Sequence, residues 1–364
     1  MTALRFRFPD KKIESKRTLI FFDEIQECEE AVTALKFWTM DSRFNVVASG
    51  SLLGIDYKRA SSYPVGYVEF LEMNGMDFEE FLWANEFTLD KIATLRACFD
   101  SRMAVPPAVN SQMMQLYRTY VAIGGMPEAV QTFIDTKDFR TVHKVQGDLL
   151  KGYLYDIAHY ATASEKIKAE KCFLSLGKQL LEKENHKFKY SEVEHNGKAQ
   201  KFLSSVEWLT YANIAKVCTN VSKIAYNLVD YEIENNFRVY TSDLSLLVAM
   251  RDFELKQRIV ENSLVSNSKG GVYECAVADA LIKNGYELHF YRNETNRKEI
   301  DFLVQKNGYV IPIEVKAGNA TSKSLRDLMK NHAEIPLAYK LADANVGCSE
   351  ERVLTVPLYM SMFL

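Results

Sequence analysis

The stretch EIDFLVQKNGYVIPIEVK, residues 299–316, carries the clearest structural signal in the sequence. Asn307-Gly308 separates two alternating apolar runs, and both residues tolerate the positive φ angles that a two-residue hairpin turn needs. Counting outward from this turn places Asp301 directly opposite Glu314. The stretch therefore predicts an antiparallel hairpin with a fixed register.

The two faces of this hairpin differ in chemistry because side chains alternate along a strand. One face is charged and carries Glu299, Asp301, Glu314 and Lys316, with Glu299 opposite Lys316. The other face is apolar, and its residues are Ile300, Phe302, Val304, Ile311, Ile313 and Val315. We expect the apolar face to pack against a core.

The opposed carboxylates of Asp301 and Glu314 form a candidate metal site. Cross-strand Cβ atoms lie about 5 Å apart, so two carboxylates can share one hard cation, and Mg²⁺ fits best because it keeps several waters. Lys316 projects on the same side and can orient or help activate a metal-bound water for attack on a phosphodiester. The alternative is a solvated hairpin face, with Glu299 and Lys316 as a surface pair worth at most about 1 kcal/mol.

A wider pattern around the hairpin resembles the restriction-endonuclease-like PD-(D/E)xK family. It consists of Tyr273-Glu274 in a predicted helix, Glu299-Ile300-Asp301-Phe302, and Ile313-Glu314-Val315-Lys316-Ala317-Gly318. The resemblance implies that Asp301 and Glu314 are metal ligands and that Lys316 is the catalytic lysine. It also implies that Glu274 is an auxiliary acid at the metal.

The bulk properties favour a soluble, multi-domain chain. Its 364 residues are 47% hydrophobic, and the formal charge of −3 excludes a basic coat over the whole surface. The apolar runs are far shorter than the roughly 20 residues that span a bilayer, and the first residues do not form a secretory signal. Six separated cysteines, with no Cys or His at metal-site spacing, predict reduced thiols in a cytoplasmic protein.

Pro106-Pro107 and Gly270-Gly271 interrupt the helical patterns and predict two boundaries. The fold class expected from this division is a multi-domain α/β protein. Its regions are a truncated P-loop-type α/β core at residues 1–105, a helical and winged-helix-like middle at residues 106–265, and a restriction-endonuclease-like α/β domain at residues 266–364.

The middle region is mainly helical and contains one turn, at Gly124-Gly125-Met126-Pro127, since these residues cannot continue a helix. Helical stretches at residues 173–194 and 199–218 flank Asn196-Gly197, and the strand Phe237-Val239-Tyr240 follows. This order is typical of a winged helix.

Lysines interleaved with aromatic residues in this region suggest phosphate contact. These lysines are Lys183, Lys187, Lys189, Lys198 and Lys201. Several glutamates, including Glu192 and Glu194, dilute the positive charge. We therefore favour the alternative, a solvated helical face that serves as a packing module.

Near the N-terminus, the apolar run Thr18-Leu19-Ile20-Phe21-Phe22 ends in Asp23-Glu24, and a helical pattern and a second short strand, residues 45–51, follow. Two strands around one helix predict a parallel α/β unit. An apolar strand that ends in two acids is the layout of a Walker B element, in which Asp23 reaches Mg²⁺ through water and the catalytic Glu24 orients the attacking water. The alternative is two acids favourably placed at a helix N-terminus.

These segments resemble the Walker B to sensor segment of AAA-type ATPases, with Ser49 or Ser51 in the sensor position. Together with Gly124-Gly125-Met126-Pro127-Glu128 and Ile313-Glu314-Val315-Lys316, their order resembles a family of bacterial and archaeal ATP-binding proteins. That family joins an AAA-type core to a C-terminal domain of unknown function with a nuclease-like fold. The resemblance implies that ATP is a cofactor and that Asp23 and Ser49 bind it.

The phosphate-binding loop of such proteins, Gly-x-x-x-x-Gly-Lys-Ser/Thr, has no counterpart here because no glycine precedes Gly50. We therefore expect a chain truncated at its start, which binds ATP negligibly on its own.

Two functional hypotheses result. The first is an AAA-type ATP-binding protein with a nuclease-like C-terminal domain that acts on or regulates nucleic acid, with DNA or another protein as partner and without a membrane. The second is a non-catalytic binding or regulatory protein whose ATPase-like and nuclease-like domains are interaction scaffolds. Nucleic-acid cleavage that is lost when Asp301 or Lys316 is replaced would support the first hypothesis over the second.

Overall fold

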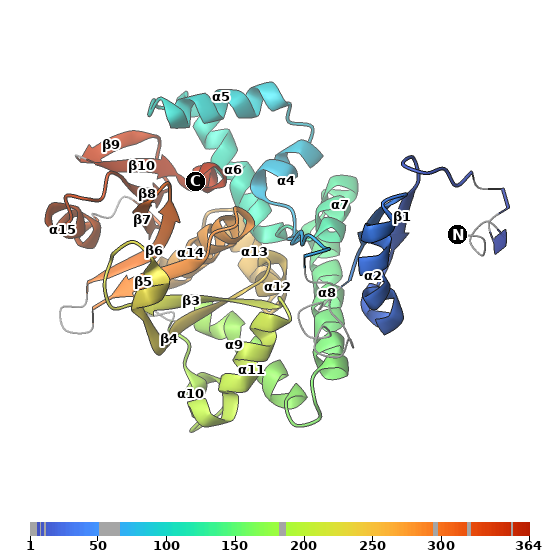
Figure 1. The fold of residues 1–364 in the computed structure, drawn as a ribbon. Helices are drawn as coiled ribbons and strands as arrows, with labels where there is room; N and C mark the ends of the chain where they lie inside the picture. The colour runs from blue at the N-terminus through green and yellow to red at the C-terminus, as the bar shows by residue number, and fades with distance from the viewer. Residues whose placement is uncertain are drawn as a thin grey trace. The chain divides into compact units, whose positions relative to one another are not determined.

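The computed structural model describes residues 6–7, 9–10, 12–50, 66–181, 187–293, 298–318, 322–350 and 352–364. The chain divides into two compact units, Met1–Met73 with Tyr211–Asn213, and Asn74–Thr210 with Ile214–Leu364 (Figure 1). Both units combine helices with strands, which confirms the predicted mixed α/β class.

The first unit holds a two-stranded parallel sheet whose strands are joined through a helix. β1 (Leu19–Phe22) pairs with β2 (Asn45–Ala48), and η1 (Ile25–Glu27) and α2 (Glu29–Asp41) lie between them in the chain. The strand, helix and strand expected at this end of the chain are thereby confirmed.

Helices make up the first part of the second unit. They are α4 (Phe78–Ala84), α5 (Leu89–Asp100), α6 (Pro107–Ile123), α7 (Pro127–Thr136), α8 (Phe139–Tyr160), α9 (Lys166–Leu181), α10 (Tyr190–Val193) and α11 (Ala199–Tyr211). Pro107 begins α6, because proline at the first turn lacks only an N–H that the helix leaves unpaired. The two prolines therefore start a helix within this unit.

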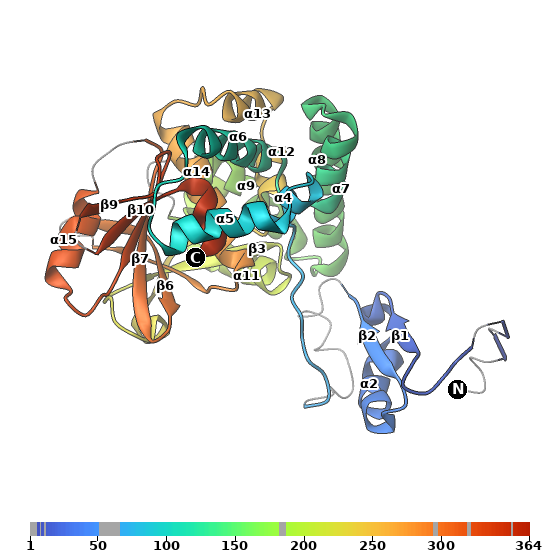
Figure 2. The same ribbon diagram turned by 90° about the horizontal axis from the view of Figure 1, so that it is seen from above.

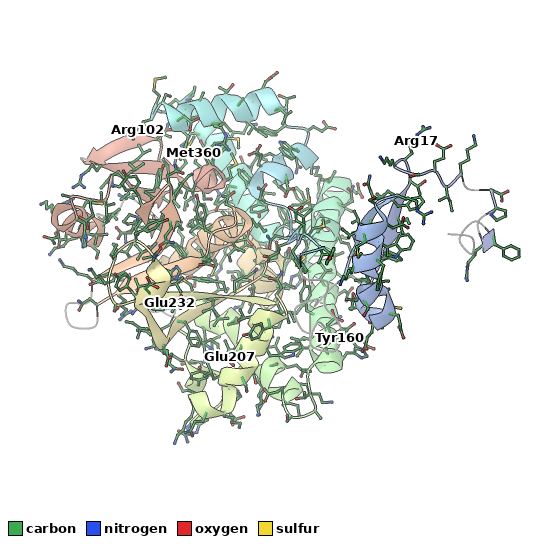
Figure 3. All side chains as sticks on the ribbon, in the orientation of Figure 1. Arg17, Arg102, Tyr160, Glu207, Glu232 and Met360 are labelled. Carbon is green, nitrogen blue, oxygen red and sulfur yellow. The ribbon has the colours of Figure 1, made fainter. Side chains whose placement is uncertain are left out.

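The second part is a mixed sheet, eight-stranded in the described residues, which helices cover on both faces (Figures 1 and 2). In spatial order its strands are β4 (Glu232–Thr241), β3 (Ala215–Val221), β5 (Leu288–Arg292), β6 (Glu299–Lys306), β7 (Tyr309–Lys316), β8 (Ala338–Ala342), β10 (Val353–Pro357) and β9 (Gly347–Glu350). The remaining helical elements are η2 (Leu228–Tyr231), α12 (Leu244–Ala249), α13 (Phe253–Val260), α14 (Ser266–Lys283), α15 (Lys323–Asn331) and η3 (Leu358–Phe363). At the start of β4, Glu232 lies 2.8 Å from His289 Nε2 on β5 (Figure 3).

The hairpin of β6 and β7 has the predicted register, with paired residues from Lys306 and Tyr309 next to the turn to Phe302 and Ile313. Farther from the turn, where β6 pairs with β5, the register shifts between Leu303 and Ile300. Such a bulge inserts an extra residue into one strand, so the alternation of faces is interrupted. The predicted apolar face is therefore broken at Ile300.

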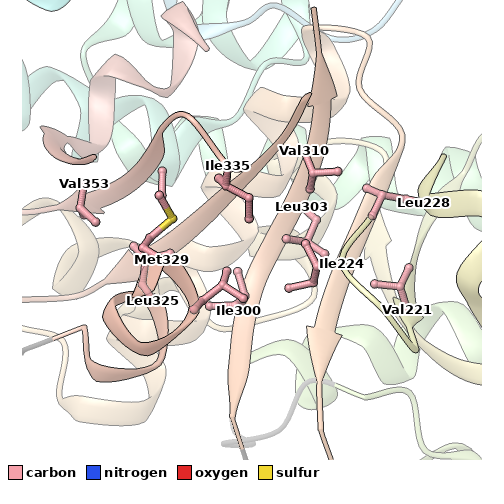
Figure 4. Close-up of a cluster of buried hydrophobic side chains, with 12 residues drawn as sticks. Val221, Ile224, Leu228, Ile300, Leu303, Val310, Leu325, Met329, Ile335 and Val353 are labelled. Atoms are coloured by element: carbon pink, nitrogen blue, oxygen red, sulfur yellow. The ribbon is translucent and has the colours of Figure 1, made fainter. Parts of the chain in front are cut away.

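Both faces of the hairpin are buried, so the predicted division into an apolar and a charged face is wrong. Ile300, Leu303 and Val310 pack in one cluster with residues of α15 (Figure 4). On the opposite face, Phe302 contacts Tyr240 at a ring distance of 6.0 Å. Because helices cover both faces of the sheet, apolar residues are required on both. The charged residues are confined to the end away from the turn.

Gly270-Gly271 lies inside α14 and does not break it, contrary to the sequence expectation. A Cβ atom on Gly271 would lie 2.3 Å from the carbonyl oxygen of Leu180 in α9. The glycine therefore allows close contact between α14 and α9, and this packing outweighs its low helix propensity.

Gly124-Gly125-Met126-Pro127 forms the predicted turn, between α6 and α7. Gly124 has a φ of 76°, and a Cβ atom there would lie 2.2 Å from the backbone nitrogen of Ser245. The Gly125 N–H donates to Asp243 Oδ1 at 3.0 Å. The motif is therefore required by close packing within the second unit.

A buried ionic cluster lies beside this turn. Lys283 Nζ is 2.7 Å from Asp243 Oδ2 and 2.8 Å from Asp279 Oδ2, and all three side chains are less than 5% exposed. Lys283 and the Tyr120 hydroxyl both donate to the Met76 carbonyl oxygen, at 3.1 and 2.9 Å. The cluster thus fastens the segment before α4 to helices α6 and α14.

Candidate functional site

Charged residues from four elements meet at the end of the hairpin away from its turn. They are Arg238 on β4, Glu274 on α14, Glu299 and Asp301 on β6, and Glu314 and Lys316 on β7. Lys316 Nζ lies 2.6 Å from Glu314 Oε1, and the Val315 N–H donates to Asp301 Oδ2 at 2.7 Å. The side chains of Asp301, Glu314 and Lys316 therefore lie in one cluster, as the register predicted.

Arg238 is the internal cation of this cluster, and the sequence reasoning missed it. Its side chain is 1% exposed, its Nη1 lies 2.7 Å from Glu274 Oε1, and it also pairs with Glu299. The guanidinium carbon lies 4.3 Å from the centre of the Phe290 ring. The only sequence signal was a charged residue inside the apolar strand at residues 237–240.

The sequence suggested a surface pair between Glu299 and Lys316, but Glu299 forms its ion pairs elsewhere. It pairs with Arg238 and, at 3.1 Å, with Arg292. Lys316 pairs with Glu314 on its own strand instead. The bulge in β6 and the neighbouring strands redirect these contacts, and neither is visible in the hairpin sequence.

Asp301 and Lys316 both have shifted proton affinities in this cluster. Burial and the Glu274 carboxylate raise the pKa of Asp301 to about 7, against the opposing charges of Arg238 and Lys316. Burial favours the neutral form of Lys316, but the Glu314 carboxylate outweighs it and raises the pKa of the lysine. Lys316 is therefore a cation at neutral pH.

Of the three carboxylates predicted to bind metal, Glu314 has an oxygen atom that is open to a cation. Glu314 Oε2 is buried and has no hydrogen-bond partner among the described residues. Glu274 Oε1, in contrast, accepts from Arg238 at 2.7 Å and from the Tyr240 hydroxyl at 2.8 Å. In the part of the chain that the structure describes, no three His, Cys, Asp or Glu side chains are grouped to hold a metal. Asp301 and Glu314 would hold Mg²⁺ together with several waters, and this metal site stays a prediction.

In the first unit, Asp23, Glu24 and Ser49 lie together where β1 and β2 end. The Ser49 hydroxyl donates to Asp23 Oδ1 at 2.6 Å, and the Glu24 N–H donates to Ser49 Oγ at 3.3 Å. Glu24 has a φ of 49°, a conformation uncommon outside turns. Ligands of open parallel sheets usually bind at these strand ends. Ser51, the other sensor candidate, lies outside the described residues.

One of the lysines expected to contact phosphate, Lys201, belongs to an ion-paired group that also includes Lys171. Lys171 Nζ lies 2.7 Å from Glu194 Oε2, and Lys201 pairs with the other oxygen of the same carboxylate. Hydrogen bonds from these two lysines lower the pKa of Glu194 to about 2. Lys183 lies outside the described residues. The pairing reduces the positive charge available to phosphates and favours the packing alternative.

Comparison with protein-family models divides the chain into three matched segments. Residues 3–82 match the model of an AAA domain. Residues 114–257 match a domain of unknown function, DUF8612, and residues 269–359 match another, DUF4143. The chain combines an AAA-type N-terminal domain with a C-terminal domain of unknown function. This confirms the family resemblance at that level.

No curated protein and no solved structure matches the chain. Among the described residues, no helix has the length and apolar character that crossing a bilayer requires.

Proposed function

We propose that this AAA-type protein uses its C-terminal domain as a Mg²⁺-dependent phosphodiesterase that acts on nucleic acid. The observation that carries the proposal is the convergence of Asp301, Glu314 and Lys316 at one end of the hairpin, where the Lys316 side chain is 27% exposed. Two carboxylates and a lysine at the ends of adjacent strands are the groups that metal-assisted phosphodiester cleavage needs. A mixed sheet between α14 and α15 supports the restriction-endonuclease-like assignment.

Each residue of the cluster has a separate role in this proposal. Asp301 and Glu314 would hold Mg²⁺, which supplies a Lewis acid and an activated water when bound. Lys316, kept protonated by Glu314, stabilises the negative charge that develops on the phosphate. It acts as a fixed cation, because a protonated lysine cannot accept the proton of the attacking water. Glu274 and Arg238 hold β4, α14 and β6 in place around it.

For the first unit we propose that it supplies the Walker B and sensor residues of an AAA-type nucleotide site. Asp23 and Ser49 would contact the Mg²⁺–ATP complex, and Glu24 would orient the attacking water. The Ser49 hydroxyl fixes the Asp23 carboxylate through a hydrogen bond of 2.6 Å, which supports this assignment. Because the sequence contains no Gly-x-x-x-x-Gly-Lys-Ser/Thr motif, we infer that this chain alone binds ATP negligibly.

A second function, a non-catalytic scaffold in the cytoplasm, is favoured by one specific observation. Arg238 already neutralises Glu274 and Glu299 inside the cluster, so those acids need no metal for charge compensation. In that case the buried network serves stability alone, and the domain binds a protein or DNA partner without cleaving it.

The deciding experiment measures cleavage of plasmid DNA, single-stranded DNA and RNA by the purified chain with and without Mg²⁺. Asp301→Asn and Lys316→Met are expected to lower the rate at least about 100-fold, since each removes a charged group that contacts the metal or the phosphate. Lys306→Met is the matched control, because Lys306 is exposed near the turn of the same hairpin. Equal rates for the wild type and all three variants, or cleavage of none of the substrates, would favour the scaffold.

A further inference from the structure

A cavity with hydrogen-bonding walls lies beyond the carboxyl end of β8. Its volume is about 460 Å³. Its polar lining consists of Asn110, Ser111, Arg118, Asn262, Asp343 and Asn345. One wall belongs to α6, the second to the segment that follows β8, and the third to the residues that follow α13. Its size suits a ligand as large as a nucleotide.

Two asparagines fix the walls of this cavity. Asn345 accepts from the Val105 N–H at 2.9 Å and donates to the Val105 carbonyl at 2.7 Å, which ties the segment after β8 to the start of α6. Asn110 accepts from the Tyr359 hydroxyl at 3.0 Å. Because these amides are held within the protein, the cavity is formed before any ligand arrives.

Arg118 provides the cationic group of the cavity. Its Nε is buried and has no hydrogen-bond partner among the described residues. An unpaired buried N–H is unfavourable, and an arginine fork binds phosphate through two parallel hydrogen bonds. Asp343 and Asn262 offer acceptor atoms in the same cavity, with Asn262 Nδ2 3.5 Å from Asp343 Oδ2. The lining thus matches a ligand that joins an anionic group to hydrogen-bond donors.

The cavity and the proposed cleavage site lie at the same edge of the sheet. Asp343 directly follows Ala342, which is the register partner of Lys316 in the parallel pairing of β7 and β8. Burial raises the pKa of Tyr273 to about 12, with a further contribution from Asp343, while the charge of Arg118 and a hydrogen bond from its side chain oppose the rise. Part of the Arg118 guanidinium is therefore held by Tyr273. Tyr273 directly precedes Glu274 on α14. The same strand ends therefore position the cavity and the charged cluster.

We propose that this cavity binds one nucleotide unit, with the phosphate on Arg118 and the amino or hydroxyl groups of the base and sugar on Asp343 and Asn262. A nucleotide is the ligand class that combines a phosphate with several donors at this size. Its assignment to the nucleotide next to the cleaved bond of a nucleic acid rests on the proposed function. Nucleotide binding in the cavity does not depend on the proposed function.

Calorimetric titration of the full chain without divalent cations tests the proposal. The probes are the four nucleoside 5′-monophosphates, each alone, with adenosine and inorganic phosphate as separate titrations. At least one nucleotide is expected to bind at least about tenfold more tightly than adenosine or phosphate, because only it fills both halves of the cavity. Arg118→Met and Asn262→Gly are each expected to weaken that binding about tenfold or more.

Three controls make the outcomes decisive. Asn262 is exposed and has a φ of 56°, which glycine adopts without strain, so Asn262→Gly leaves the fold intact even if Arg118→Met does not fold. Asn331→Ala, an exposed change on α15, is expected to leave affinity unchanged. Inorganic phosphate that binds as tightly as the nucleotides, or affinity that both cavity variants retain, overturns the proposal. Nucleotide binding by a wild-type chain that cleaves neither DNA nor RNA with Mg²⁺ supports the cavity and refutes only the proposed function.

Discussion

Replacement of Lys283 by methionine is expected to destabilise the second unit most strongly at neutral pH. Lys283 is the cation between Asp243 and Asp279, and it also donates to the Met76 carbonyl oxygen. Methionine has similar length but no charge, so both carboxylates lose their buried partner. Removal of one member of a buried ionic group costs about 3–5 kcal/mol.

The pH dependence of this loss follows from Asp279. Burial raises its pKa from 3.8 to about 6 despite the opposing charge of Lys283. A carboxyl with a raised folded pKa contributes stability that is fully present below its unfolded pKa and is lost as pH rises through its folded pKa. Without Lys283 the pKa of Asp279 in the folded protein rises further, so the free energy of unfolding continues to fall above pH 6. At 1.36 kcal/mol per pH unit, the difference between variant and wild type grows by about 1–2 kcal/mol from pH 5 to pH 7.

Urea unfolding followed by tryptophan fluorescence measures this difference. In a Trp38→Phe background the remaining tryptophans, Trp83 and Trp208, both belong to the second unit. Asp279→Asn added to Lys283→Met is expected to recover part of the loss at pH 7, because the buried carboxylate is gone. Lys306→Met, an exposed control with the same charge change, is expected to cost less than about 0.5 kcal/mol. The reasoning would be refuted if Lys283→Met lowered the free energy of unfolding equally at pH 5 and pH 7, or by less than about 1 kcal/mol at both.

Two backbone features give further predictions. Gly124→Ala is expected to lower the free energy of unfolding by several kcal/mol, measured by thermal unfolding, because its Cβ atom would lie 2.2 Å from Ser245 N at a φ of 76°. Gly147 lies inside α8, and a Cβ atom added there has nothing within 4 Å. Gly147→Ala is therefore expected to stabilise the protein by about 0.5–1 kcal/mol. If both changes have the same sign, the packing argument fails. Asp77→Ala removes the capping box with Glu80 at the start of α4 and is expected to cost about 1 kcal/mol in the same assay. An unchanged melting temperature would contradict the assigned cap.

The hairpin was predictable because its signals are local. Asn307 and Gly308 fix the turn, and the strands around it alternate, so the register follows from counting. The bulge near Ile300 was not predictable, since it arises from pairing with β5 rather than from the hairpin itself. The same limit applies to Arg238, whose partner Glu274 is 36 residues away in the chain. Local patterns cannot identify such partners.

Tertiary contacts decide the roles of Gly270-Gly271 and of Lys201. Gly270-Gly271 indicated a boundary by composition, but the fold uses Gly271 to bring α14 against α9. Lys201 suggested phosphate contact, but its position opposite Glu194 was invisible in the sequence. In both cases a partner from another element outweighs the local preference.

The arrangement of α14 explains why the candidate site depends on the whole second unit. Near its middle, Glu274 is held by Arg238 from β4, a strand that precedes the expected boundary at residue 266. At its end, Lys283 holds the segment before α4 through the Met76 carbonyl oxygen. A chain that began at residue 266 would lack β3, β4 and Arg238, so β5 would become an edge strand and Glu274 would be a buried acid without its cation. The region that would support the proposed chemistry at Asp301 and Lys316 therefore extends upstream through the helices, and the sheet and the helical part stabilise one candidate site together.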